Sequence, residues 1–179
     1  MNENKLPPNY FEFYDLPVQF NPDQQLVKAK FYALSKQYHP DFYANESEDK
    51  QAEVLNLSTL NNKAYQTLSN FRNRLKYILE LKGVVQADEG YQLPQTFLME
   101  MMDVNEALMD LEFEPDVDKL SQVSQEVEVI EKQLDDELNS LINQFDQHPD
   151  DADQVLLNIK DIFYRQKYIA RIKERFQNA

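Results

Sequence analysis

Glycine is nearly absent from this chain, and this absence restricts the fold more than any other feature of the sequence. Only Gly83 and Gly90 occur among 179 residues, and both lie between long segments of helical periodicity. Glycine-containing turns are therefore few, and no segment shows the alternation of apolar and polar residues typical of a half-buried strand. Because 42% of the residues are hydrophobic, the chain can bury a core. We therefore predict an all-α protein.

Four helices are predicted in residues 1–82, the first of two expected domains. Asn21 is expected to cap the second helix, with Pro22 at its first helical position. This helix should end at His39-Pro40, because the residue before a proline avoids the helical region, and a polar loop should follow. Gly83 fits the C′ position after the fourth helix. The other three helices are expected at residues 10–15, 48–68 and 71–82.

The second and third of these helices are predicted to be amphipathic. When one residue is placed every 100° around each helix, the apolar residues gather on one face. The apolar stripes consist of Val27, Phe31, Leu34 and Tyr38 in one helix, and of Val54, Leu57, Leu60, Ala64, Tyr65 and Leu68 in the other. The face of the second helix opposite its stripe carries Lys28, Tyr32 and Lys36. We expect the two helices to form an antiparallel hairpin with residues 39–41 at its tip.

A linker at residues 83–94 is expected to lead into a second domain at 95–179. Its helices are predicted at residues 95–112, 116–146 and 151–177, each from apolar residues spaced by three and four. Long helices joined by short loops pack as antiparallel neighbours. The simplest arrangement is a three-helix bundle.

The helix at residues 95–112 carries two apolar stripes instead of one. The predicted core stripe consists of Phe97, Met101, Val104, Leu108 and Leu111. The second stripe consists of Leu98, Met102 and Met109, with Met99 beyond it and Asp103, Glu106 and Asp110 along its border. Such a stripe can pack against a second neighbouring helix, or it can form an adaptable methionine-rich surface for a partner. The pattern alone leaves both interpretations open.

Charge is distributed unevenly along the chain. The net charge is −14, and residues 83–159 carry 20 acidic but only 2 basic residues, whereas residues 160–179 carry 6 basic and 2 acidic residues. An acidic segment of this length repels phosphate backbones, so binding to nucleic acid is not expected. The segment can serve as a solvated surface or as an electrostatic docking surface.

Composition excludes several other classes. Cysteine is absent, so disulfides, thiolate metal sites and cysteine-ligated clusters on this chain are excluded. No apolar run approaches the ~20 residues that span a bilayer, and the N-terminal residues resemble neither a signal nor a transit peptide. We expect a soluble cytoplasmic protein with no membrane association.

Both histidines of the chain are followed by Pro-Asp, at residues 39–41 and 148–150. The second copy has a structural explanation: Pro149 separates two long helices, and Asp150 or Asp151 can cap the last one. The first copy is expected at the tip of a hairpin, beside a helix that bears lysines on its solvent face. We therefore assign a recognition role to the first copy and a structural role to the second.

This predicted hairpin with His-Pro-Asp at its tip resembles the J-domain co-chaperones, in which a helical hairpin carries His-Pro-Asp. The segments "KQYHPD", "LNNKAYQTL" and "RLKYILELKG" resemble one branch more closely, the HscB family of iron–sulfur cluster assembly. An acidic helical domain that opens with "FLMEMMDVNEAL" is similar to HscB as well. The resemblance covers nearly the whole chain.

The resemblance implies a non-catalytic protein without cofactor or metal that binds two partners. One is a DnaK- or HscA-type ATP-driven chaperone, whose ATPase the family stimulates. Its binding residues would be His39, Pro40, Asp41, Lys28, Tyr32 and Lys36. The other is an IscU-like iron–sulfur scaffold protein, whose contact residues would be Leu98, Met99, Met102, Asp103, Glu106, Asp110 and an aromatic residue of the last helix. Tyr168 is our choice for that aromatic residue, and Phe163 is its rival.

Three other functions are alternatives to this one. The chain could be an acidic helical adaptor with an inert hairpin, or a general J-domain co-chaperone for other clients. His39 and Asp41 could also form an acid–base pair, but this chemistry needs a pocket and a third group, which a thin hairpin does not offer. The sequence does not indicate whether the chaperone is dedicated or general, nor does it indicate the oligomeric state.

Overall fold

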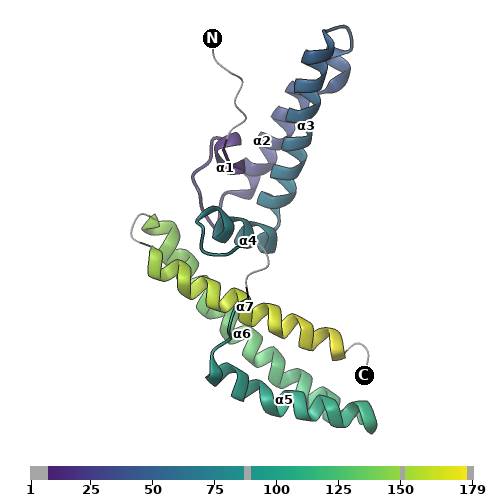
Figure 1. Ribbon diagram of the computed structural model, residues 1–179, viewed down its shortest axis with the longest axis vertical. Coiled ribbons are helices and arrows are strands. Elements are labelled where there is room, and N and C mark those ends of the chain that lie inside the picture. The colour runs from purple at the N-terminus through teal and green to yellow at the C-terminus, as the bar shows by residue number, and fades with distance from the viewer. Residues whose placement is uncertain (1–7, 87–89, 150–151, 177–179) are drawn as a thin grey trace. The chain divides into compact units, whose positions relative to one another are not determined.

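The structure, a computed structural model, describes residues 8–86, 90–149 and 152–176 (Figure 1). All regular secondary structure in these ranges is helical, which confirms the predicted fold class. The chain divides into two compact units, Met1–Gly83 and Val84–Ala179. None of the described helices is both long enough and apolar enough to cross a membrane.

The first unit is built around one long helix, α3. Its described elements are α1 (Tyr10–Phe13), α2 (Gln24–Gln37), the short 3-10 helix η1 (Pro40–Tyr43), α3 (Glu48–Ser69) and α4 (Phe71–Leu81). α1, α2, η1 and α4 all pack against α3. The core of the unit consists of Phe11, Tyr14, Phe20, Val27, Val54, Ala64, Leu68, Leu75, Ile78 and Leu79.

The start of α2 differs from the prediction. The N-cap is Asp23 and not Asn21, and Pro22 lies outside the helix. The Asp23 carboxylate accepts hydrogen bonds from the backbone N–H groups of Gln25 and Leu26 at 2.8 and 3.3 Å, and its charge also offsets the helix dipole. The segment before Asp23 is fixed outside the helix, because the Phe20 side chain is fully buried and the Phe20 carbonyl oxygen accepts a 2.7 Å hydrogen bond from Arg74 Nε.

The loop predicted after α2 is partly helical. α2 ends at Gln37, as the His39-Pro40 step predicts, but residues 40–43 then form η1. Proline at the first position fixes a helical φ, and His39 caps the turn. The Tyr43 hydroxyl closes it by donating a 2.9 Å bond to the Gln37 carbonyl oxygen.

Two buried polar side chains join the elements of the first unit. Asn61 on α3 is 1% exposed and donates hydrogen bonds to the Phe31 carbonyl oxygen at 3.1 Å and to Ser35 Oγ at 2.9 Å. Arg74 is 5% exposed and also donates to the Leu68 carbonyl oxygen. The side chain of Asn61 thus joins α3 to the C-terminal half of α2, the helix that leads to His39.

The second unit is a three-helix arrangement in which every pair of helices makes contact. Its helices are α5 (Gln95–Phe113), α6 (Val117–Gln147) and α7 (Asp153–Phe176). The predicted core stripe of α5 is confirmed, because Phe97, Met101, Val104, Leu108 and Leu111 are all buried. They pack with Val123, Val127, Leu134, Leu138, Ile142 and Phe145 of α6, and with Val155, Leu156, Ile159, Ile162, Ile169 and Ile172 of α7.

Candidate docking surfaces

The first His-Pro-Asp lies where the chain turns between α2 and α3, which run side by side (Figure 1). His39 precedes η1, and Pro40 and Asp41 open it. The side chains of His39 and Asp41 are 52% and 85% exposed. Both polar groups are therefore accessible to a partner at the tip of a hairpin.

Local hydrogen bonding orients the imidazole of His39. Its Nδ1 accepts a 3.3 Å bond from the backbone N–H of Asp41 and lies 3.7 Å from the Asp41 carboxylate. A neutral imidazole that accepts at Nδ1 carries its proton on Nε2. The Phe42 ring, which is 67% exposed, lies 5.5 Å from the imidazole, centroid to centroid. The tip therefore offers an Nε2–H donor, a carboxylate and an aromatic face together.

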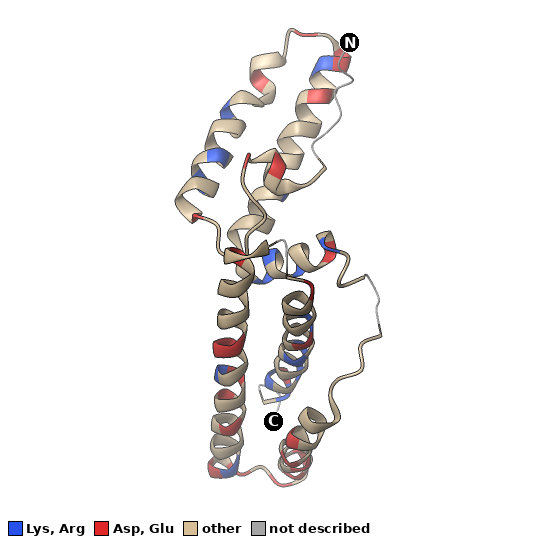
Figure 2. Cartoon of the chain, turned by 90° about the vertical axis from the view of Figure 1, so that its left-hand side faces the viewer, with Lys and Arg blue, Asp and Glu red and all other residues tan. Residues whose placement is uncertain are grey.

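The exposed face of α2 continues from this tip. Lys28, Tyr32 and Lys36 are all exposed, as their helical positions predict. Lys30 is engaged within the unit by a 2.9 Å ion pair with Asp15, whereas Lys28 and Lys36 make no ion pair with any carboxylate in the described ranges. In Figure 2, basic positions (blue) occur along α2, whereas acidic positions (red) predominate on α5 and α6.

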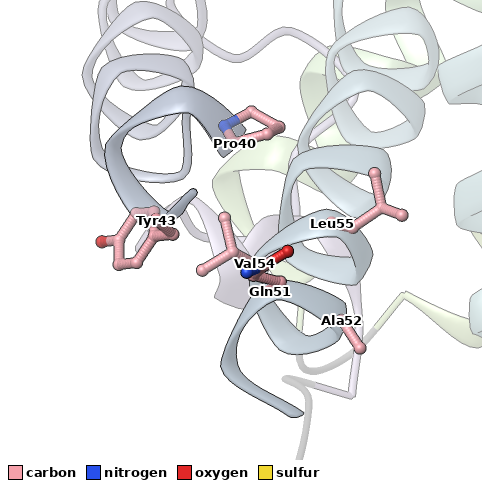
Figure 3. Close-up of a pocket in the computed structure, with 6 residues that line it drawn as sticks. All are labelled: Pro40, Tyr43, Gln51, Ala52, Val54 and Leu55. Atoms are coloured by element: carbon pink, nitrogen blue, oxygen red, sulfur yellow. The ribbon is translucent and has the colours of Figure 1, made fainter. Parts of the chain in front are cut away.

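A cavity of about 220 Å³ lies between η1 and α3. Pro40 and Tyr43 of η1 line one side, and the α3 residues Gln51, Ala52, Val54 and Leu55 line the other (Figure 3). Leu55 is 58% exposed. η1 packs against α3 beside this cavity, and Pro40 belongs both to the cavity lining and to the turn that presents His39 and Asp41.

The second His-Pro-Asp has a different setting. His148 is the C-cap of α6, and its backbone N–H lies 3.1 Å from the carbonyl oxygens of both Gln144 and Phe145. The helix ends at Gln147, before Pro149, as predicted. The predicted capping role of Asp150 or Asp151 lies outside the described residues. What the structure describes of this copy is the termination of a helix.

The second stripe of α5 is a surface. Leu98, Met99, Met102 and Met109 are 43, 64, 63 and 56% exposed. The interpretation that these four side chains pack against another helix of the bundle is therefore wrong, because they stay exposed while the core stripe is buried. Asp103, Glu106 and Asp110 are also exposed, so an apolar strip with an acidic border faces solvent.

One of these border carboxylates is held in place by a lysine of α6. Asp110 accepts a 2.8 Å hydrogen bond and ion pair from Lys119. This hydrogen bond raises the pKa of the Lys119 ammonium, and the charges of Asp110, Asp116 and Glu106 raise it further. Asp103 and Glu106 make no such pair with any lysine or arginine of the described segments.

Of the two aromatic candidates on α7, Tyr168 lies against the α5 surface. Its hydroxyl accepts a 2.8 Å hydrogen bond from Asn105 Nδ2, and its ring meets Phe97 edge-on at 5.7 Å between centroids. Phe163 instead meets Tyr164 of its own helix edge-on at 5.3 Å. Tyr168 is therefore the α7 aromatic residue that the structure joins to α5.

Asn105 was not among the residues predicted for this surface. Asn105 continues the second stripe, because residues 98, 102, 105 and 109 follow helical spacing. Its amide also donates to the Met101 carbonyl oxygen at 2.7 Å and accepts from Arg175 at 3.1 Å. A polar residue within an otherwise apolar stripe was the signal available in the sequence.

Comparison with solved structures relates the chain to one family. The structure of chaperone HscB from Vibrio cholerae matches with a TM-score of 0.68 and 31% sequence identity, over 95% of this chain and 96% of that chain. The chain belongs to the HscB family. Human co-chaperone protein HscB matches with a TM-score of 0.70 and 26% identity, over 96% of this chain and 83% of that chain.

Sequence comparisons agree with this membership of the HscB family. The family model described as the HSCB C-terminal oligomerisation domain matches residues 93–177. Co-chaperone protein HscB of Proteus mirabilis is 34% identical over 113 residues, and the HscB homolog of Vibrio cholerae is 39% identical over 101 residues. These alignments cover 63% and 56% of this chain, and they span 65% and 59% of the two curated relatives.

Proposed function

We propose that this HscB-family protein is a co-chaperone of the cytoplasm that couples two partners. The N-terminal unit binds a DnaK- or HscA-type chaperone and stimulates its ATPase, and the C-terminal unit binds an IscU-like scaffold protein and delivers it to that chaperone. The observation that carries the proposal is the exposed His39-Pro40-Asp41 at the tip of the α2–α3 hairpin. The names of the relatives support the co-chaperone role.

At the chaperone end, the proposed action is allosteric. His39 Nε2–H and the Asp41 carboxylate contact the chaperone more favourably in its hydrolysis-competent state than in its resting state. Such differential contact shifts the chaperone's population toward the competent state. Lys28 and Lys36 accelerate encounter with an acidic patch on the chaperone, so association becomes slower as salt concentration rises.

At the scaffold end, binding rests on the exposed strip of α5. Leu98, Met99 and Met102 supply apolar contact, and methionine adapts to an irregular partner surface. Asp103, Glu106 and Asp110 form an acidic edge that favours a partner with basic side chains at matching positions. Tyr168 adds an aromatic contact that Asn105 holds in place.

A coupled ATPase assay tests the proposal. The ATPase of the chaperone is measured with this protein, with the scaffold, and with both together. We expect stimulation by the protein alone and greater stimulation when the scaffold is added, since delivery brings the client to the chaperone. A protein that binds the scaffold but leaves the ATPase unchanged would be an adaptor, and the proposal would be wrong.

A further inference from the structure

The contact between Asn105 and Tyr168 joins the α5 strip to a second surface strip on α7. Tyr164, Tyr168, Arg171 and Arg175 follow one another at helical spacing along α7. Two of these residues form hydrogen bonds with Asn105. The Tyr168 hydroxyl accepts one at 2.8 Å, and the Arg175 guanidinium donates one at 3.1 Å. The exposed surface of α5 is therefore continuous with this side of α7.

Most of the cations near this strip are neutralised within the unit. Arg165 pairs with Asp161, Lys173 pairs with Glu131 at 2.6 Å, and Arg175 pairs with Glu112 at 2.9 Å. The positive charges of these three residues are therefore balanced by carboxylates of the same unit. These residues have little electrostatic attraction left for a partner.

Lys167 and Arg171 differ from these cations. Both are exposed, and within residues 8–86, 90–149 and 152–176 neither forms an ion pair with a carboxylate. Each is held over aromatic rings instead. The Lys167 ammonium lies 5.6 Å from the ring centroid of Phe163 and 5.4 Å from that of Tyr164, and the Arg171 guanidinium lies 5.7 Å from that of Tyr168.

A cation held over an aromatic ring keeps its full charge. The ring restricts the side chain through the cation–π attraction, so less conformational entropy is lost when a partner binds. This arrangement prepares Lys167 and Arg171 for an anionic group from outside the unit. Both residues belong to the basic segment 160–179, which carries 6 basic and 2 acidic residues, whereas residues 83–159 carry 20 acidic and 2 basic residues.

The charges across the combined surface are therefore ordered. Glu106 and Asp103 form an acidic edge on α5, and Leu98 and Met102 lie beside them. The Asn105–Tyr168 hydrogen bond marks the boundary between α5 and α7. Arg171 and Lys167 lie on the α7 side of this boundary. Figure 2 shows the same contrast between acidic positions on α5 and basic positions on α7.

We propose that the scaffold-binding surface extends across Tyr168 onto α7, where Lys167 and Arg171 bind an acidic side chain of the scaffold protein. This inference rests on the proposed scaffold-binding function and deepens it. The partner must present a basic group opposite the α5 edge and an acidic group opposite the α7 edge, with apolar residues between them. Two edges of opposite charge also fix the orientation of the bound partner, which a single acidic edge does not.

Calorimetry with a purified IscU-like scaffold protein tests the proposal in the full-length chain. The doubly neutralised variant with Lys167→Gln and Arg171→Gln should weaken binding by about threefold to tenfold at low salt, as expected for two solvent-exposed charge contacts. It should also lessen the dependence of affinity on salt. Arg171→Lys in an otherwise unchanged chain should retain most of the affinity, because the charge is kept.

Lys132→Gln is the matched control. Lys132 lies on α6, is exposed, and forms a 2.6 Å ion pair with Asp136, so its neutralisation removes one positive charge, where the double variant removes two, without touching the strip. We expect it to leave affinity unchanged. If the double variant and the control bind the scaffold equally well, the proposed extension onto α7 is wrong.

The test separates this inference from the scaffold-binding function itself. Replacement of Leu98 and Met102 with serine probes the α5 strip alone. Loss of binding in that variant, with full binding in the Lys167→Gln, Arg171→Gln variant, would contradict only the extension onto α7. Full binding in both would contradict the scaffold-binding function as well.

Discussion

The hydroxyl of Tyr14 donates a 2.9 Å hydrogen bond to the side-chain oxygen of Asn61, which lies 47 residues further along the chain. Tyr14 is fully buried just after α1, and Asn61 is in the middle of α3. Because Asn61 in turn donates to Phe31 and Ser35 of α2, one side chain links three helices. This link therefore joins the two helices of the hairpin that presents His39 to each other and to Tyr14.

The first prediction concerns the stability that this link provides. Tyr14→Phe leaves the side-chain oxygen of Asn61 buried without its donor, which should lower the free energy of unfolding by about 1–3 kcal/mol. Tyr32→Phe is the matched control, because Tyr32 is 60% exposed and undergoes the same chemical change. Urea unfolding should separate the two variants. Equal stabilities would show that the Tyr14 hydroxyl contributes nothing.

The second prediction concerns the pH dependence of stability. Burial, reinforced by Tyr65, raises the pKa of the Tyr14 phenol well above its ordinary value of 10.0. Above pH 10 the unfolded chain loses this proton while the folded chain keeps it, so the stabilisation from this group is complete below pH 10 and declines as pH rises further. Between pH 9 and pH 11, the free energy of unfolding should decline less for Tyr14→Phe than for the wild type.

The third prediction concerns the α5 strip. Leu98→Ser combined with Met102→Ser should weaken scaffold binding by at least about tenfold, the loss expected when apolar residues at the centre of an interface are removed. Leu157→Ser on α7 is the control, since Leu157 is also an exposed leucine, at 51%. Calorimetry should detect the loss only in the double variant. An equal loss in the control would indicate a general effect of removing surface apolar groups.

The fourth prediction separates the two aromatic candidates of α7. Tyr168→Ala removes the ring that adjoins the α5 strip and should reduce affinity for the scaffold, whereas Phe163→Ala should not. Both side chains are half-buried, so thermal unfolding is measured in parallel to confirm that each variant is folded. A larger loss of affinity from Phe163→Ala would place the aromatic contact elsewhere on α7.

Much of the fold could be predicted from apolar spacing, because a helix that buries one face must repeat apolar residues every three or four positions. The core stripe of α5 and the exposed face of α2 followed from that period. The N-cap of α2 did not, because Asn21 and Asp23 are both good caps and the choice depends on Phe20 and Arg74, a residue distant in sequence.

For the candidate site, the sequence predicted which residues share a face of one helix, but not the contacts between helices. Exposure of the second α5 stripe depends on how α6 and α7 pack, so the sequence left it open. The roles of Asn61 and Asn105 depend on partners at Tyr14 and Tyr168, 47 and 63 residues away. Helical spacing within one segment contains no information about such contacts.

The measurement that tests the central claim most directly is the ATPase of a DnaK- or HscA-type chaperone with the His39→Gln and His148→Gln variants of the full chain. His39 is exposed at the hairpin tip, whereas His148 ends α6. We predict that His39→Gln reduces stimulation by about tenfold or more, because an interaction specific to the competent state is lost, and that His148→Gln stimulates as the wild type does. Full stimulation by His39→Gln would contradict the account.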